Sequence, residues 1–202
     1  MTEFTLYFFK RKRIELYLKH RYLTSSFEVG EMMSVNNNLS ADLNRYNSRK
    51  DMPKFQKWMR KYQGENNPII KMIYKILFVY HRNKNCNEIS GDSVIGGGLY
   101  IGHPFGITIN ANATIGSNCN IHKGVTIGQE NRGFRKGCPT IGNRVWIGIN
   151  STIVGHITIG DDVLIAPNSF VNFDVPPHSI VLGNPGRIIH KENATEGYIN
   201  NL

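Results

Sequence analysis

The fold is decided by residues 141–171, which read IGNRVWIGINSTIVGHITIGDDVLIAPNSFV. Every sixth residue of this stretch is β-branched and aliphatic, and glycine often follows it. These positions are Ile141, Ile147, Ile153, Ile159, Ile165 and Val171. An α-helix cannot use a period of six, and simple strand alternation would not single out every third inward position. A triangular β-helix does both, because each hexapeptide forms one flat side with its β-branched residue stacked inward.

The same period continues upstream in two further blocks that are offset from each other by two residues. The blocks are Ile89, Ile95, Ile101 and Ile107, then Ile109, Ile115, Ile121 and Ile127. The sequence therefore predicts a mainly β fold, a left-handed parallel β-helix over residues 88–175, with a slip between Ile107 and Ile109. At one strand spacing of about 4.8 Å for each coil, this length makes roughly five coils.

Three segments fall outside the period. Residues 129–139 are polar and basic, which predicts a loop that projects from the coil and could carry binding groups. Residues 176–202 form a C-terminal tail. Residues 1–87 place apolar side chains at three- and four-residue spacings, typical of amphipathic helices, with a linker near residues 30–40. The expected organisation is a small α-helical N-terminal domain followed by the β-helix and its tail.

The positive charge belongs to the N-terminal region alone. Residues 1–87 hold 17 Lys and Arg against 7 Asp and Glu, whereas residues 88–202 hold 7 against 8. No nucleic-acid reader motif accompanies this charge, so nucleic acid is not expected as a partner. An anionic membrane surface or an acidic polysaccharide would suit it. A solvated helical face explains the charge equally well.

The cysteines and the apolar stretches bear on location. Cys86, Cys119 and Cys138 follow neither a metal-site nor a disulfide spacing, which fits a reducing compartment and predicts no metal site. Residues 69–80 are interrupted by two lysines and fall far short of the about 20 residues that span a bilayer. We expect a cytoplasmic protein whose membrane contact, where it has any, is peripheral.

Five motifs carry a resemblance to a known family. They are GGGLYIGHPFGITIN (residues 96–110), GVTIG (124–128), CPTIG (138–142), VWIG (145–148) and VPPHSIVLGNPGRII (175–189). With them the chain resembles the hexapeptide-repeat acyltransferases over about residues 70–190. Within that group it resembles the serine acetyltransferase branch and its relatives in capsule and exopolysaccharide synthesis, including colanic-acid-type O-acetyltransferases.

The resemblance implies direct transfer of an acetyl group from acetyl-CoA to a hydroxyl, without an acyl-enzyme. His103 takes the place of the family's catalytic histidine, and an imidazole is a suitable general base at neutral pH. Glu88 falls where the family has an aspartate that orients this imidazole. An 18-residue coil would instead place Asn85 directly below His103. A structural corner histidine packed under Phe105, and a solvated Glu88, remain the alternatives.

The resemblance also implies that acetyl-CoA binds in a groove between neighbouring subunits of a homotrimer or a dimer of trimers. No metal is implied. Arg187 and Lys191 could meet the nucleotide phosphates, since cationic side chains pair well with phosphate. The positions that match the family's coenzyme A site are Gly128, Gln129, Gly148, Ile149, Ala166, Pro167, Arg187 and Lys191.

The chain departs from serine acetyltransferases where they bind their amino acid. Gly102 stands where they carry an aspartate, and Gly137 and Cys138 stand where they carry arginine and histidine. A zwitterion without its ion-pair partners binds poorly. We therefore expect Gly102, Phe105 and Cys138 to shape a pocket for a sugar hydroxyl in capsule or exopolysaccharide biosynthesis. Serine or another small hydroxylated acceptor is the alternative, and a non-catalytic scaffold is the third.

Three further histidines do not follow a metal-ligand spacing. They are His122, His156 and His178, and the coil places them on different sides. We expect structural or surface roles for all three.

Overall fold

Two helices lead into the β-helix. The computed structural model describes residues 38–200, so residues 1–37, including most of the predicted linker, lie outside the described part. A short helix over residues 38–44 precedes α3 (Lys54–Gln63) and α4 (Pro68–Lys84). Pro53 stands at the N-cap of α3, and the Asn67 side chain accepts hydrogen bonds from the first backbone N–H groups of α4. Asn67 is a preferred N-cap residue and Pro68 occupies the first turn of α4, where proline is favoured, whereas Pro53 makes no capping hydrogen bond.

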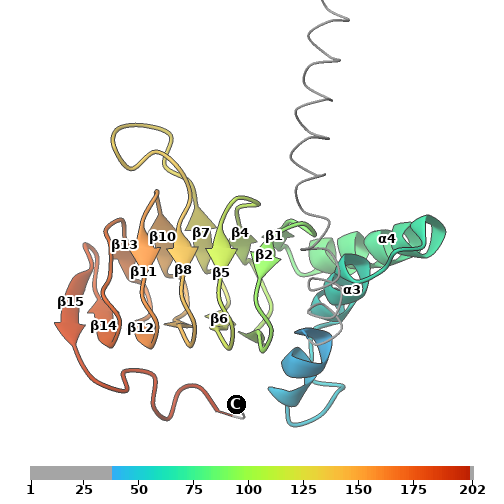
Figure 1. The fold of residues 1–202 in the computed structure, drawn as a ribbon, viewed down its shortest axis with the longest axis horizontal. Helices are drawn as coiled ribbons and strands as arrows, with labels where there is room; N and C mark the ends of the chain where they lie inside the picture. Colours follow the sequence, from blue (N-terminus) through green and yellow to red (C-terminus); the bar gives the residue numbers. More distant parts are fainter. Residues whose placement is uncertain (1–37, 201–202) are drawn as a thin grey trace, which may run out of the picture. The chain divides into compact units, whose positions relative to one another are not determined.

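The rest of the described chain winds into a β-helix with three flat faces, as Figure 1 shows. Face A consists of β1 (Glu88–Ile89), β4 (Thr108–Ile109), β7 (Thr126–Gly128), β10 (Thr152–Val154) and β13 (Phe170–Val171). Face B consists of β2 (Val94–Ile95), β5 (Thr114–Ile115), β8 (Thr140–Ile141) and β11 (Thr158–Ile159). Face C consists of β3 (Tyr100–Gly102), β6 (Asn120–His122), β9 (Trp146–Ile147), β12 (Val163–Ile165), β14 (Ser179–Leu182) and β15 (Arg187–His190). Strand pairs are parallel except β14 with β15, which confirms the predicted parallel β-helix.

The inward isoleucines form ladders, as the period predicted. On face A the register aligns Ile89, Ile109, Ile127, Ile153 and Val171, all buried. Each side chain contacts its equivalent in the next coil, one strand spacing away. β-branched side chains suit such stacking because they are stiff and fill the narrow interior closely.

The predicted two-residue slip is present, but it lies in the turn between Gly102 and Thr108 and not between Ile107 and Ile109. The first coil contains two extra residues, since Glu88 pairs with Thr108 and Gly102 with His122, and the extra residues lie in the turn after Gly102. Ile107 is buried, but it stands outside the main ladder, because it is Ile109 that aligns with Ile89. Ile107 is six residues after Ile101, but because the turn is enlarged, the residue that enters the ladder is Ile109, eight residues after Ile101. The enlarged turn is the one that carries His103.

The strands of face C continue past residue 175, where the six-residue pattern becomes hard to follow. β14 adds a further parallel strand, and β15 folds back on it in antiparallel fashion. After β15 the tail runs back along the β-helix toward the first coils (Figure 1). Buried Asp162 anchors it by accepting hydrogen bonds from the backbone N–H groups of Ala194 and Thr195 and from the Thr195 hydroxyl. The tail is therefore an ordered part of the fold.

The helices are joined to the first coil by a buried ion pair. Arg60 of α3 meets Asp42 at 2.8 Å, and it also donates to the carbonyls of Ile95 and Gly96. Asp42 accepts in turn from the backbone N–H of Leu99. A charge pair with all its donors and acceptors used fixes the orientation of the helices on the coil.

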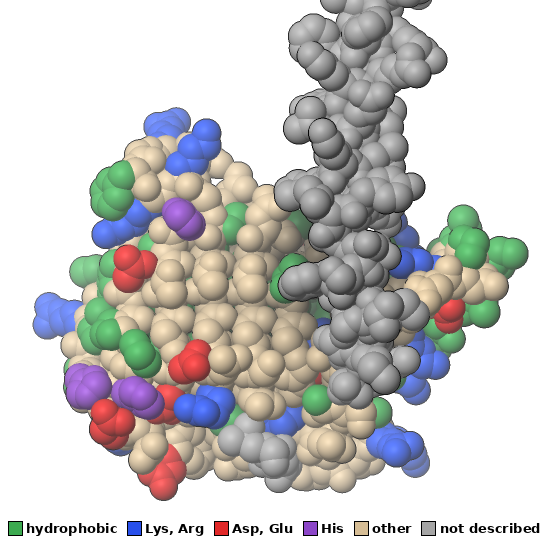
Figure 2. Space-filling model, in the orientation of Figure 1, with side chains coloured by type: hydrophobic (Ala, Val, Ile, Leu, Met, Phe, Trp, Pro, Cys, Tyr) green, Lys and Arg blue, Asp and Glu red, His purple; other side chains and the backbone are tan. Residues whose placement is uncertain are grey.

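One face of α4 is exposed and apolar. Its outward stripe repeats at helical spacing, and the apolar side chains gather at the end of the molecule where α4 lies (Figure 2). The stripe contains Ile69, Met72, Ile73, Ile76 and Tyr80, each at least half exposed. No helix among residues 38–200 is long and apolar enough to cross a membrane.

Candidate functional site

His103 stands at the edge between faces C and A, here called the C/A edge. It directly follows β3, has a φ of +57° and has an exposed side chain. The turn is braced from below, since the Asn85 side chain donates to the Pro104 carbonyl at 2.7 Å and the Asn87 side chain accepts from Ile107 N–H at 2.8 Å. A left-handed conformation is costly for a residue with a Cβ, and it persists where the surroundings impose it. The enlarged turn thus presents the imidazole to solvent.

Glu88 lies on face A, paired with Thr108, and its side chain is exposed. No ion pair between Glu88 and His103 occurs among the described residues. Asn85, by contrast, contacts the His103 turn, as coil counting indicated. The predicted carboxylate–imidazole pair is therefore not formed within the single chain, and its role in the reaction stays a prediction.

His122 lies beside His103, one coil further along the same edge. Its strand pairs Gly102 with His122, and a Cβ added at Gly102 would come within 2.8 Å of the imidazole. The His122 Nδ1 is 3.0 Å from the Ile147 carbonyl, and the ring contacts Trp146 at 4.7 Å between centroids. Burial lowers the pKa of His122, and the neighbouring His103 lowers it further. Sequence reasoning expected only a structural or surface role here.

Several of the predicted coenzyme A positions lie along the C/A edge. Gly148 and Ile149 follow β9, and Ala166 and Pro167 follow β12 in the next coil. A Cβ at Gly148 would meet the Pro167 backbone nitrogen at 2.6 Å, so glycine allows these coils to stack closely. Arg187 pairs with Leu182 at the end of β14 on the same edge. The edge thus begins with two imidazoles, continues with small residues and ends near a cation.

The remaining predicted residues lie elsewhere. Gly128 ends β7 and Gln129 follows it, at the edge between faces A and B, here called the A/B edge, where the loop 129–139 leaves the coil. Glu130 and Gly137 pair across the base of this loop. Lys191 contacts the His178 carbonyl where face C begins, so it stands across face C from Arg187. One chain alone does not bring these three to the C/A edge.

The predicted acceptor residues are split in the same way. Gly102 lies on the C/A edge. Phe105 lies in the His103 turn, where the residue is 57% exposed. Cys138 is at the A/B edge, half-buried against the core, and burial raises the pKa of its thiol. A raised pKa keeps a thiol protonated and unreactive, which disfavours a role as nucleophile. Among residues 38–200 no group of three or more His, Cys, Asp or Glu could hold a metal ion.

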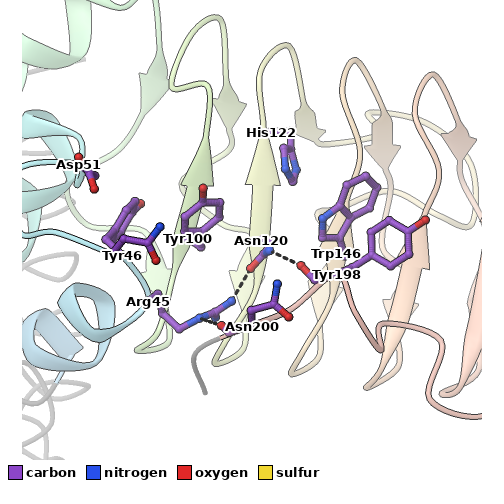
Figure 3. Close-up of a pocket in the computed structure, with 10 residues that line it drawn as sticks. Arg45, Tyr46, Asp51, Tyr100, Asn120, His122, Trp146, Tyr198 and Asn200 are labelled. Carbon is purple, nitrogen blue, oxygen red and sulfur yellow. Dashed lines mark hydrogen bonds between the residues drawn. The ribbon is translucent and has the colours of Figure 1, made fainter.

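Sequence reasoning missed a cavity of about 410 Å³ beside His122 (Figure 3). Its walls come from face C of the first three coils, from the segment before α3 and from the C-terminal tail. The lining residues are Arg45, Tyr46, Asn47, Asp51, Tyr100, Asn120, His122, Trp146, Tyr198 and Asn200. Tyr100, Asn120 and Trp146 are aligned by the strand register, but they are 20 and 26 residues apart, so no regular spacing in the sequence marked them as neighbours.

Comparison with known families agrees with the repeat. The family described as bacterial transferase hexapeptide (six repeats) matches residues 138–172, and the hexapeptide repeat of succinyl-transferase matches residues 106–130. The two matches together cover less than half of the chain. They support the hexapeptide-repeat acyltransferase family, and they do not distinguish a capsule branch within it.

Several individual relatives that match this chain are named serine acetyltransferases. A serine acetyltransferase of Synechococcus elongatus is 38% identical over 104 residues, which is 52% of this chain and 43% of the relative. The solved serine acetyltransferase of Brucella abortus has a TM-score of 0.64 at 26% identity, covering 86% of this chain and 73% of that one. That of Neisseria gonorrhoeae in complex with serine has a TM-score of 0.58 at 26% identity, with coverage of 84% and 72%. The chain spans about half the length of the curated relatives it matches.

Proposed function

We propose that this chain, whose repeat domain is of the hexapeptide-repeat acyltransferase kind, transfers an acetyl group from acetyl-CoA to an acceptor hydroxyl. The observation that carries the proposal is the exposed His103 in the enlarged first turn of the C/A edge. His103 takes the hydroxyl proton as the oxygen attacks the thioester carbonyl. The carbon–sulfur bond then breaks, and the imidazolium returns the proton to the departing thiolate. General base catalysis of this kind contributes about 10²–10⁴-fold in rate.

The chain's own residues fit an elongated co-substrate along this edge. Gly148 and Ala166 leave the surface narrow and free of bulky side chains, and exposed Arg187 at the far end can pair with phosphate. From the coil of His103 to that of Leu182 is four strand spacings, or about 19 Å. Acetyl-CoA would supply the activated acyl group near His103. Ile149 and Pro167 complete the edge, and Lys191 contributes less because it faces elsewhere.

The acceptor has two candidates. The relatives named above are serine acetyltransferases, so the comparisons favour L-serine or another small molecule over a glycan. One observation favours a sugar hydroxyl: beside Gly102 the space is filled by the His122 ring, so no carboxylate is present there to pair with the ammonium group of an amino acid. Both acceptors, L-serine and sugars, are therefore included in the activity assay.

We also propose that the active form is an oligomer, a homotrimer by resemblance. Cys138 and the loop 129–139 lie at the A/B edge of the same chain that carries His103 at the C/A edge. A second copy could bring its A/B edge, with Gly128 and Gln129, against His103. The molecular mass by sedimentation equilibrium tests this, and a monomer with full activity would contradict it.

A cytoplasmic site of action remains part of this proposal. Peripheral contact with an anionic membrane or polysaccharide is proposed from the basic charge of residues 1–87.

The test of function is thiol release from acetyl-CoA, with L-serine and a panel of sugars as acceptors. His103→Ala should lower kcat/KM by about 10²–10⁴-fold, the contribution of a general base. His190→Ala is the matched control, because this exposed histidine ends β15 where face C begins, away from both the C/A edge and the loop 129–139. Unchanged turnover in His103→Ala would remove His103 as the base. Absence of acceptor-dependent thiol release in the wild type would refute the proposed activity.

A further inference from the structure

The cavity beside His122 has walls that are held in place before any ligand arrives. Arg45 donates from Nε to the Asn200 carbonyl at 2.9 Å, from Nη1 to the Gly98 carbonyl at 2.7 Å, and from Nη2 to Asn120 Oδ1 at 2.7 Å. Asn120 donates in turn to the Tyr198 carbonyl at 3.1 Å. Figure 3 shows the bonds of Arg45 to Asn120 and Asn200 and that of Asn120 to Tyr198, which join three separate segments around one hollow. Pre-formed walls are what a small-molecule site requires.

The same bonds limit how far Arg45 is available to a ligand. It is the one Lys or Arg among the lining residues, it is buried, and each of its three guanidinium nitrogens donates to a protein oxygen. Asp51 is the only carboxylate of the lining, and it is exposed at the rim. Three of the five N–H donors of the Arg45 guanidinium are used by protein oxygens, so Arg45 serves mainly to hold the walls, and the lining residues include no second Lys or Arg to fix the carboxylate of an amino acid.

The cavity instead offers aromatic surface with polar edges. Tyr46 contacts Tyr100 at 4.9 Å between ring centroids, and Trp146 contacts His122 at 4.7 Å and Tyr198 at 5.1 Å. The rings of Tyr100, His122 and Trp146 are only half-buried, so each keeps a face or an edge open. Tyrosine and tryptophan join an apolar face to one polar group. A sugar ring matches this surface, because its C–H groups lie against aromatic faces while its hydroxyls reach the ring edges.

His122 provides a polar group of defined character next to His103. Its Nδ1 lies 3.0 Å from the Ile147 carbonyl, which can only accept a hydrogen bond, so Nδ1 carries the proton and Nε2 keeps its lone pair. Nε2 lies on the side of Gly102, the residue before His103. A neutral imidazole held in this way accepts a hydrogen bond from a hydroxyl.

We propose that this cavity is the acceptor site and that it binds an uncharged, polyhydroxylated ring, that is, a sugar. In this arrangement the sugar ring packs against Trp146 and Tyr100. His122 Nε2 accepts a hydrogen bond from one sugar hydroxyl, and the neighbouring hydroxyl faces His103. His122 is a positioning residue in this arrangement, and Gly102 provides the space for it. The proposal rests on the proposed acetyl transfer at His103 and names the class of its acceptor.

Binding without acetyl-CoA tests the cavity apart from catalysis. The probes are methyl β-D-glucopyranoside, methyl β-D-galactopyranoside, N-acetyl-D-glucosamine and L-serine, followed by saturation-transfer NMR on the full chain. At least one sugar should bind, and its Kd should rise at least tenfold in Trp146→Ala and in His122→Phe. Trp146→Phe keeps a ring and should bind within about threefold of the wild type. Trp58→Phe, on α3 and outside the cavity, is the matched control.

Kinetics with the sugar that binds provide the second readout. Trp146→Ala and His122→Asn should raise the KM for the sugar more than they lower kcat, whereas His103→Ala lowers kcat and Trp146→Phe leaves the KM close to that of the wild type. Circular dichroism melting of each variant identifies unfolding. A variant that unfolds is replaced by Gly102→Ala, whose added Cβ would come within 2.8 Å of the His122 ring and displace it, and which is subject to the same melting check.

Each outcome has one meaning. Sugar binding lost in Trp146→Ala and kept in Trp58→Phe supports the proposal. Sugar binding that both cavity variants leave unchanged, or no binding by any sugar, overturns the cavity as the acceptor site while leaving acetyl transfer intact. Serine binding that depends on Trp146 in place of sugar binding overturns the sugar class. Sugar binding at Trp146 without acceptor-dependent thiol release overturns the proposed function instead.

Discussion

The interior of the β-helix and the outer surface of face C are stabilised by different means. The interior is periodic and apolar, and every coil repeats the contacts of the coil before it, as in the ladder from Ile89 to Val171. The surface of face C is covered by segments far away in the sequence. These segments are held by individual hydrogen bonds that Arg45 donates and that the carboxylates of Asp42 and Asp162 accept. The comparison teaches that repetition provides a rigid support, whereas the candidate site is assembled from contacts that occur once.

Breaking the buried ion pair between Arg60 and Asp42 should cause the largest loss of stability among the contacts that hold the helices on the β-helix. Arg60→Ala leaves the Asp42 carboxylate buried without its charge partner, and breaking a buried pair in this way costs about 3–5 kcal/mol. We expect the free energy of unfolding in urea to fall by this amount. Lys57→Ala, an exposed change on the same helix, should stay within about 0.5 kcal/mol of the wild type. An equally stable Arg60→Ala would show that the helices are held mainly by apolar contacts.

The interior ladder should respond almost as strongly, through a different cause. Ile127→Ala removes buried methyl groups from the middle of the face A ladder and leaves a cavity, which costs about 2–5 kcal/mol. Urea unfolding followed by circular dichroism measures the loss. The matched change Thr114→Ala on exposed face B should alter the free energy of unfolding by no more than about 0.5 kcal/mol. Similar losses at both positions would mean that the ladder is no more important than the surface threonines.

What could be predicted from the sequence follows the same division. The ladders were predictable because each side of a coil must bury one β-branched residue, and that requirement appears as a period of six. The enlarged turn at His103 was misplaced, since Ile107 fits the count although it belongs to another inward column. The bonds of Arg45 to Gly98 and Asn120 had no local signal, because their sequence separations are 53 and 75 residues. Periodic packing is visible in one sequence, whereas single long-range contacts are not.

The candidate site divides in the same way. His103 and the small residues of the C/A edge were identified through motifs of the repeat. His122 was given a structural or surface role, because nothing near it in the sequence shows that an enlarged first coil places it beside Gly102. The Glu88 pairing is not present within one chain, and only an assembled structure or kinetics can test it.

The tail contact should have a moderate effect that depends on pH. Burial raises the pKa of Asp162, but hydrogen bonds from Thr195, His178 and Ala194 outweigh it, and the net direction is downward. A lowered folded pKa stabilises the tail above the unfolded value of about 3.9, and this stabilisation is lost as the pH falls through the folded pKa. Asp162→Asn should cost about 1.5–3 kcal/mol at neutral pH, as expected for hydrogen bonds to a charged group.

The fluorescence of Trp146, against which Tyr198 of the tail packs, measures this release. The recording uses the Trp58→Phe background, so that Trp146 is the only tryptophan. Fluorescence that changes equally with pH in Asp162→Asn and in its parent would assign the tail's pH dependence to another group.

The smallest effect on stability should come from Glu88, where the comparison bears directly on function. Its carboxylate is exposed on face A and makes no ion pair with His103, so Glu88→Gln should change the free energy of unfolding by no more than about 0.5 kcal/mol. If assembly with a second copy brings Glu88 against His103, the same variant should lower the pKa seen in the pH profile of kcat/KM, because a nearby carboxylate stabilises the imidazolium. An unchanged profile together with unchanged stability would make Glu88 a solvated side chain. The enlarged first turn, braced by Asn85 and Asn87, would then be sufficient to orient His103.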